Sequence, residues 1–172
     1  PVPLASPPVA VWTPAEFARR SLSRHWSLEE ATESLTAAVD DAVAGLVGLE
    51  GTLAAEVSGG LDSSTVAASL VRNAGIPVPL WLNAYGATPE ADERVYVQAL
   101  AETLAISPAL VPHAAGRLTE ALLERISGDL RPGLNALDVH HDMEWARQVT
   151  GAGATALMTG KGGDSIFLQN AS

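Results

Sequence analysis

The residues best suited to chemistry lie between Ser58 and Ser64, which read Ser-Gly-Gly-Leu-Asp-Ser-Ser. They follow an apolar run, residues 52–57, and precede apolar residues at helical spacing, so we expect a strand, a tight loop and a helix. Gly59 and Gly60 can take backbone conformations that bring N–H groups close to a ligand. The start of the following helix adds further N–H groups and the positive end of its dipole. The pattern predicts a cradle for phosphate groups.

Asp62 is the one acid in this stretch, where Ser58, Ser63 and Ser64 offer hydroxyl donors. A carboxylate beside phosphate oxygens is repulsive unless a divalent cation lies between them, and Mg²⁺ is commonly held by one or two carboxylates together with phosphates. Asp62 therefore implies a metal. The alternative is a plain turn after a strand, with Asp or Ser acting only as a helix N-cap.

A second glycine-rich loop reads Thr-Gly-Lys-Gly-Gly-Asp from Thr159 to Asp164 and follows an expected strand at 154–158. Asp164 can supply a second carboxylate that faces Asp62 across a cleft and completes the magnesium site. It can equally cap the last helix.

Lys161 is the only lysine of the chain. A lone cation between two glycines that face phosphates favours a polyphosphate or a substrate carboxylate as its partner. A P-loop is excluded by spacing, because Thr155 stands where its first glycine belongs and Gly162 where Ser or Thr is needed.

Four short apolar runs alternate with helical patterns along the chain. We expect a parallel sheet flanked by helices on both faces, since this alternation is typical of α/β proteins. Its ligand should lie beyond the carboxyl ends of the strands. The expected strands are 52–57, 78–84, 109–111 and 154–158, and the expected helices are 15–24, 28–46, 61–73, 90–104, 118–126 and 139–149, with a loop at 131–137 and a last helix from 164.

Composition narrows the class of protein. The chain has 172 residues, 47% of them hydrophobic, no cysteine and a formal charge of −10. One domain of this length can bury a core, disulfides and thiolate metal sites are excluded, and scattered basic residues argue against nucleic acid. No apolar run is long enough to span a membrane, so we expect a cytoplasmic protein. The proline-rich start suggests that 1–27 is a linker or the tail of a preceding domain, and we expect a fragment.

Two polar clusters carry weaker signals. Asp138, His140, His141 and Asp142 resemble metal ligands, but no third firm ligand is evident and a solvated or cleft-lining helix is the simpler interpretation. Residues 92–94, Asp-Glu-Arg, fit the charged start of a helix.

The loop at Ser58–Ser64 resembles the pyrophosphate-binding loop of ATP pyrophosphatases, in the form found in the asparagine synthetase family, which includes β-lactam synthetases and lasso-peptide macrolactam cyclases. The second loop matches the family form Ser/Thr-Gly-x-Gly-x-Asp at Thr159, Gly160, Gly162 and Asp164. At 161 this chain has Lys, where asparagine synthetases have Glu and β-lactam synthetases have Tyr, in the acceptor-substrate site. The segments 89–94, 135–138 and 162–167 resemble the macrolactam-cyclase branch and favour it.

This resemblance implies an adenine nucleotide α-hydrolase-like fold, truncated here, with 28–172 forming the N-terminal part of a synthetase domain. It implies ATP and Mg²⁺ as cofactors, with the metal on Asp62 and Asp164 and catalytic roles for both. Lys161 departs from the family form, and the catalytic role that we predict for it rests on its charge between the two glycines. Its nucleotide-binding residues would be Val57, Ser58, Gly59, Gly60, Leu61, Asp62, Ser63, Ser64, Ala84, Thr159 and Gly160.

The implied activity is an ATP-dependent ligase that adenylates a carboxylate, releases pyrophosphate and forms an amide with an amine of an amino acid or peptide. A glutaminase domain, or a peptidase and precursor peptide, would be its partners. An ATP pyrophosphatase of the NAD synthetase or tRNA-modifying kind, and a non-catalytic nucleotide-binding module, remain as alternatives.

Overall fold

The structure is a computed structural model that describes residues 15, 18–19, 25–48, 51–73, 75–126 and 138–163. The chain divides into two compact units, Pro1–Ala38 and Val39–Ser172. Helix α2, Leu28–Val47, begins in the first and ends in the second. Its start is a capping box as expected, because Glu30 N–H donates to Ser27 Oγ at 3.1 Å and Ser27 N–H donates to Glu30 Oε2 at 2.9 Å.

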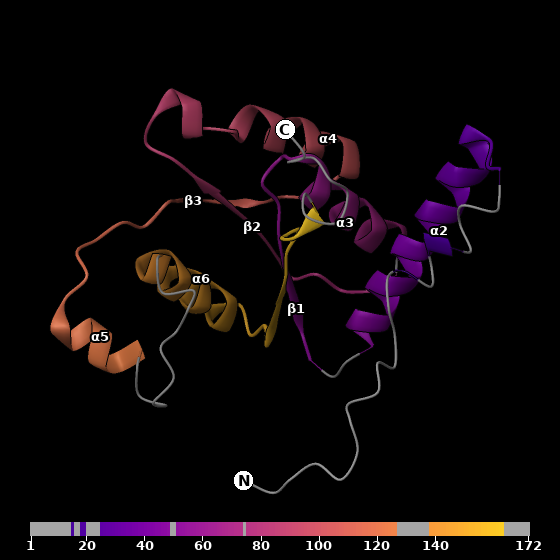
Figure 1. Cartoon of the computed structure of the whole chain (residues 1–172). Helices are drawn as coiled ribbons and strands as arrows, with labels where there is room; N and C mark the ends of the chain where they lie inside the picture. The colour runs from indigo at the N-terminus through magenta and orange to yellow at the C-terminus, as the bar shows by residue number, and fades with distance from the viewer. Residues whose placement is uncertain are drawn as a thin grey trace, which may run out of the picture. The chain divides into compact units, whose positions relative to one another are not determined.

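The second unit contains a four-stranded sheet, formed by β1 (Leu53–Glu56), β2 (Leu80–Tyr85), β3 (Ala109–Pro112) and β4 (Ala156–Met158) (Figure 1). The strand order is β3-β2-β1-β4. Every pair is parallel, and Ala54 pairs with Leu80 on one side and Leu157 on the other. The predicted α/β class and parallel sheet are confirmed. Because β1 is central, the loops that follow β1 and β4 leave neighbouring strands at the same edge of the sheet.

Helices cover both faces of the sheet, since successive side chains of a strand point to opposite faces. On one face Ala54 and Leu82 pack with Trp145 and Val149 of α6 (Val139–Gly151). Against the other face pack the second half of α2, α3 (Leu61–Arg72) and α4 (Arg94–Leu104). They contact Leu53 and Ala55 of β1 and Val57, the residue that follows it.

A polar contact joins α2 to α3. Ser69, fully buried, donates its hydroxyl to Asp40 Oδ1 at 2.5 Å, and Arg72 donates to both carboxylate oxygens, at 2.7 and 3.2 Å. These bonds lower the pKa of Asp40, the Arg72 bond most of all, because they favour its charged form. The C-terminal end of α3 is thus anchored on α2 by both apolar and ionic contacts.

The expected helix 90–104 differs from the structure. A 3₁₀ turn, Pro89–Ala91, comes first, and α4 begins only at Arg94. The break follows from Asp92, whose Oδ1 accepts from Arg94 N–H and Nε while Oδ2 accepts from Nη2, so the aspartate folds back onto the start of α4 instead of continuing a helix. Arg94 also lies over the Tyr85 ring, 4.1 Å from its centroid.

The other boundaries shift by a few residues. Strands β1 and β4 are shorter than expected, and α5 (Glu120–Ile126) begins at Glu120, after Thr119 accepts a hydrogen bond from Leu122 N–H. Of the expected helix at 15–24, residues 15 and 18–19 are described and helical; the rest, the loop at 131–137 and the helix from 164 lie outside the described residues. Within the described part of the chain, no helix has the length and apolarity needed to cross a membrane.

Candidate functional site

The first loop is held in shape by its own serines. Ser58 N–H donates to Ser63 Oγ at 3.1 Å, Gly60 N–H donates to Ser58 Oγ at 3.3 Å, and the two hydroxyl oxygens are 2.9 Å apart. Ser63 Oγ in turn donates to Gly60 O at 3.2 Å. Ser63 is buried, and its hydroxyl bonds within the loop. The sequence predicts this hydroxyl as a donor to a ligand and does not predict its structural role. Backbone N–H groups at the start of α3 are left for a ligand, since the first turn of a helix lacks internal acceptors.

Only one of the paired glycines uses a conformation that other residues avoid. Gly59 has φ +84°, and a β-carbon there would lie 2.7 Å from Tyr96 Cβ. Gly60, the N-cap of α3, has φ −73°. The alternative of an Asp or Ser N-cap is therefore wrong, because Asp62 lies inside the first turn and Gly60 makes no side-chain cap. Gly59 lets the loop lie against the backbone of α4.

The second loop packs directly on the start of α3. A β-carbon at Gly160 would lie 2.5 Å from Ser63 N, and one at Gly163 would overlap the carboxylate of Asp62. Gly160 is thus limited to glycine by the backbone of the first loop, whereas a side chain at 163 would have to move the Asp62 carboxylate. Two segments about a hundred residues apart in the sequence meet here because β1 and β4 are neighbours.

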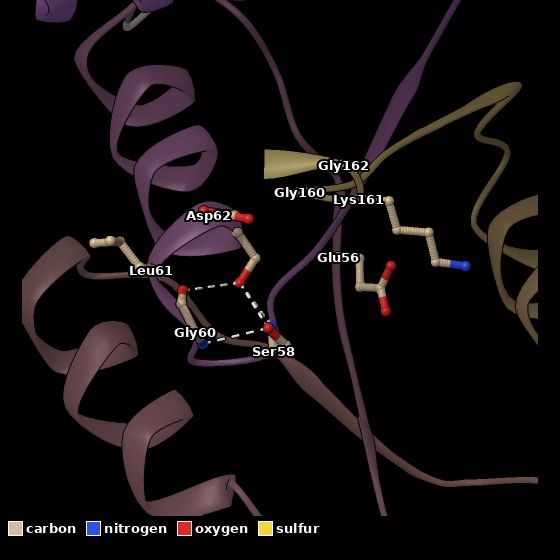
Figure 2. Close-up of a pocket in the computed structure, with 9 residues that line it drawn as sticks. Glu56, Ser58, Gly60, Leu61, Asp62, Gly160, Lys161 and Gly162 are labelled. Atoms are coloured by element: carbon tan, nitrogen blue, oxygen red, sulfur yellow. Dashed lines mark hydrogen bonds between the residues drawn. The ribbon is translucent and has the colours of Figure 1, made fainter. Parts of the chain in front are cut away.

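A cavity of about 460 Å³ lies where the two loops meet (Figure 2). Of the residues predicted for the site, its lining includes Ser58, Gly60, Leu61, Asp62, Ser63, Gly160 and Lys161. Glu56 and Gly162 complete the lining. The lining combines glycine backbone and the start of α3 with the charged side chains of Glu56, Asp62 and Lys161, which suits a polar ligand.

Several predicted residues lie elsewhere. Val57 and Ala84 point their side chains into the two cores, and Ser64 and Gly59 are absent from the lining. Thr159 lines a neighbouring cavity, and its hydroxyl accepts from Lys161 N–H at 3.4 Å. Asp164 lies outside the described residues.

The Asp62 carboxylate is half-buried at the cavity, and within the described ranges no hydrogen bond or ion pair joins it to another residue. A free carboxylate beside a phosphate-shaped cradle is the donor that Mg²⁺ would use together with phosphate oxygens. Asp62 is therefore chemically suited to serve as one ligand of a magnesium ion, although no group of three or more His, Cys, Asp or Glu ligands occurs among the described residues.

Glu56 was missed by sequence reasoning. It ends β1, is half-buried, and lines both the 460 Å³ cavity and a second cavity of about 600 Å³ on the α6 side of the sheet. Lys161 is the one other residue that the two linings share. The available signal was a charged residue in a central parallel strand, where both faces are normally apolar.

Asn83 supports the loop from beneath. It is buried in β2, and its Nδ2 donates to Val57 O at 2.8 Å, at the residue before the loop begins. Its Oδ1 has no partner among the described residues. The contact fixes the carbonyl at which β1 turns into the loop.

The histidines near the start of α6 form a different arrangement from a metal site. His113 stacks on His141 with centroids 4.5 Å apart, and its Nε2 lies 3.2 Å from Asp138 Oδ2. His140 Nε2 lies 3.2 Å from Arg117 O. In the part of the chain that is described, no three His, Cys, Asp or Glu side chains gather as metal ligands.

Comparison with known proteins agrees with the two loops. The family model for asparagine synthase matches residues 34–170, a range that holds every strand and both loops. Comparison with curated proteins gives no match. The match covers most of the chain, so the chain belongs to the asparagine synthase family.

Proposed function

We propose that this chain is the ATP-binding part of an amide ligase that activates a carboxylate as an acyl-adenylate. The observation that carries the proposal is the meeting of two glycine-rich loops at one cavity, with the Asp62 carboxylate on its wall and without a protein partner among the described residues. Family membership supports ATP as the co-substrate.

In the proposed reaction a substrate carboxylate oxygen attacks the α-phosphorus of ATP. The bond between the α-phosphorus and the bridging oxygen breaks, and pyrophosphate leaves into the cradle of Ser58–Ser63. An amine then attacks the acyl carbon, an amide bond forms, and AMP leaves with the oxygen that joined it to the acyl group; the amine proton passes to solvent. N–H groups at the start of α3 would stabilise charge that gathers on the leaving phosphates.

Asp62 would hold Mg²⁺, and Asp164 is proposed as the second carboxylate. When bound, the ion supplies charge neutralisation at the phosphate oxygens. Lys161 would add a positive charge near the attacking carboxylate, which weakens its repulsion by the phosphates.

The proposed acid and amine are groups of an amino acid or a peptide, and macrolactam formation on a precursor peptide is one form of this reaction. We propose a cytoplasmic location, residues 28–172 as the N-terminal part of the synthetase domain, and a glutaminase domain or a peptidase as the partner that would supply ammonia or peptide.

ATP–pyrophosphate exchange by the full-length protein, with a panel of amino acids and peptides, tests the proposal. Exchange that requires a particular acid, and that falls by at least 100-fold in Asp62→Asn, is the expected result. Asp41→Asn is the matched control, because Asp41 is exposed on α2 and not in the cavity lining. Nucleotide binding without exchange for any acid would instead favour a non-catalytic nucleotide-binding module.

A further inference from the structure

Glu56 and Lys161 lie at the junction of the two cavities. They are the two residues common to both linings, so a ligand that extends from the phosphate cradle into the α6 side of the sheet passes between them. Figure 2 shows both side chains on the same side of the cradle, away from Asp62. The junction therefore carries one negative and one positive group.

Glu56 and Lys161 do not form an ion pair with each other. Their atoms are not within ion-pair distance, and no described residue bonds to the Glu56 carboxylate. The carboxylate oxygens of Glu56 are therefore free to accept, and a cationic ligand group in the cavity could donate charge-assisted hydrogen bonds to them. The free space between Glu56 and Lys161 is available to such a group.

We propose that Glu56 is a specificity-determining residue that binds the protonated amino group of the acid substrate, whose carboxylate lies toward Lys161. The substrate class is then a zwitterion, an amino acid or a peptide end with a free amino group near the carboxylate. The inference rests on the proposed function, because it assigns groups within the same site. Glu56 acts in recognition, and no proton transfer is assigned to it.

The electrostatic argument favours a zwitterion over a simple acid. Lys161 alone would accept any carboxylate. Glu56 at the junction, with Asp142 farther along the lining of the cavity of about 600 Å³, repels a second anion and attracts an ammonium group. A chain with a formal charge of −10 also disfavours polyanionic substrates other than the metal-bound nucleotide.

The test compares ATP–pyrophosphate exchange with free amino acids and with their N-acetyl forms, in the wild type and in Glu56→Gln. In the wild type, acetylation should lower kcat/KM on the order of 10- to 100-fold, as expected for a lost charge-assisted hydrogen bond. In Glu56→Gln the free and acetylated acids should differ by less than about threefold. For the free amino acid, Glu56→Gln should raise KM for the acid and leave KM for ATP unchanged.

Two controls separate the outcomes. Glu124→Gln removes an exposed carboxylate of α5 that lines neither cavity, and it should keep the preference for the free amino group. The rise in melting temperature produced by Mg²⁺–ATP should be equal in Glu56→Gln and the wild type, which shows an intact cradle.

Each failure has its own signature. Equal exchange with free and N-acetylated acids in the wild type would overturn the role of Glu56, and so would a preference for the free acid that persists in Glu56→Gln. Neither result would contradict the proposed ligase activity. Absence of exchange with every acid overturns the proposed function and, with it, this inference.

Discussion

Gly163 lies so close to Asp62 that a β-carbon at position 163 would overlap the Asp62 carboxylate. The glycine of the second loop thus sets the space in which the carboxylate of the first loop can hold a metal. A side chain at 163 must displace Asp62, although the two residues are far apart in the sequence.

Gly163→Ala should therefore weaken Mg²⁺–ATP binding by about tenfold or more, because Asp62 is moved from its place on the cavity wall. Titration calorimetry with ATP and Mg²⁺ measures the effect. Gly75→Ala is the control, since no atom lies within 4 Å of a β-carbon built there. Equal affinities of the two variants would contradict the role given to this contact.

Gly59→Ala should destabilise the fold. The position has φ +84°, and a β-carbon would come within 2.7 Å of Tyr96 Cβ and 3.0 Å of Val97 N. The strained backbone alone costs about 1–3 kcal/mol. Urea unfolding should record the loss, whereas Gly45→Ala, in an open position of α2, should be neutral or stabilising by up to about 1 kcal/mol. A Gly59 variant as stable as the wild type would rule out the conformation described.

Asn83→Leu should lower stability by about 1–3 kcal/mol, because it leaves the buried Val57 carbonyl without its donor. Nucleotide affinity should fall as well, since that carbonyl lies next to the loop. Asn83→Asp at neutral pH should be worse, because a carboxylate offers no donor and is itself buried. Thermal unfolding and ATP titration of both variants check the order; a leucine variant that matches the wild type in both would disprove the supporting role.

Lys161→Gln should raise KM for the acid substrate while it changes KM for ATP by less than about threefold, because its side chain extends away from Asp62 (Figure 2). Exchange kinetics at varied acid and at varied ATP separate the two constants. A large rise in KM for ATP would instead assign Lys161 to the phosphates.

The Asp40 contact predicts a pH dependence of stability. Bonds to Arg72 and Ser69 hold the pKa of Asp40 below its ordinary value of 3.8. A lowered pKa in the folded state means that the contribution is complete above the unfolded value and is lost as pH falls through the folded value. Asp40→Asn should thus melt below the wild type at pH 7, with a difference that shrinks below about pH 4. A difference that is constant from pH 7 to pH 2 would contradict this assignment.

The sheet, its helices and the two loops could be predicted from the sequence, because apolar runs indicate buried strands and glycines beside an aspartate indicate tight loops that can bind a ligand. Sequence reasoning missed the break before α4, since the fold-back of Asp92 onto Arg94 depends on side-chain geometry that periodicity does not encode. It also counted Ser63 as a ligand donor, although the hydroxyl closes the loop. Glu56 escaped because it looked like one more residue of a strand, and only the strand order places it between two cavities.

The pairing of β1 with β4 has a consequence for how such a protein can diversify. Hydrogen-bonded strands are held about 5 Å apart by their backbones. Backbone hydrogen bonding therefore sets the spacing of the two loops, and side-chain identity has little effect on it. The helices that cover the sheet can accumulate substitutions, and the cavity on the α6 side can be remodelled, while the nucleotide end keeps its dimensions. A new acceptor substrate can therefore be accommodated by substitutions in the lining of the α6-side cavity, while the pairing of β1 with β4 is retained.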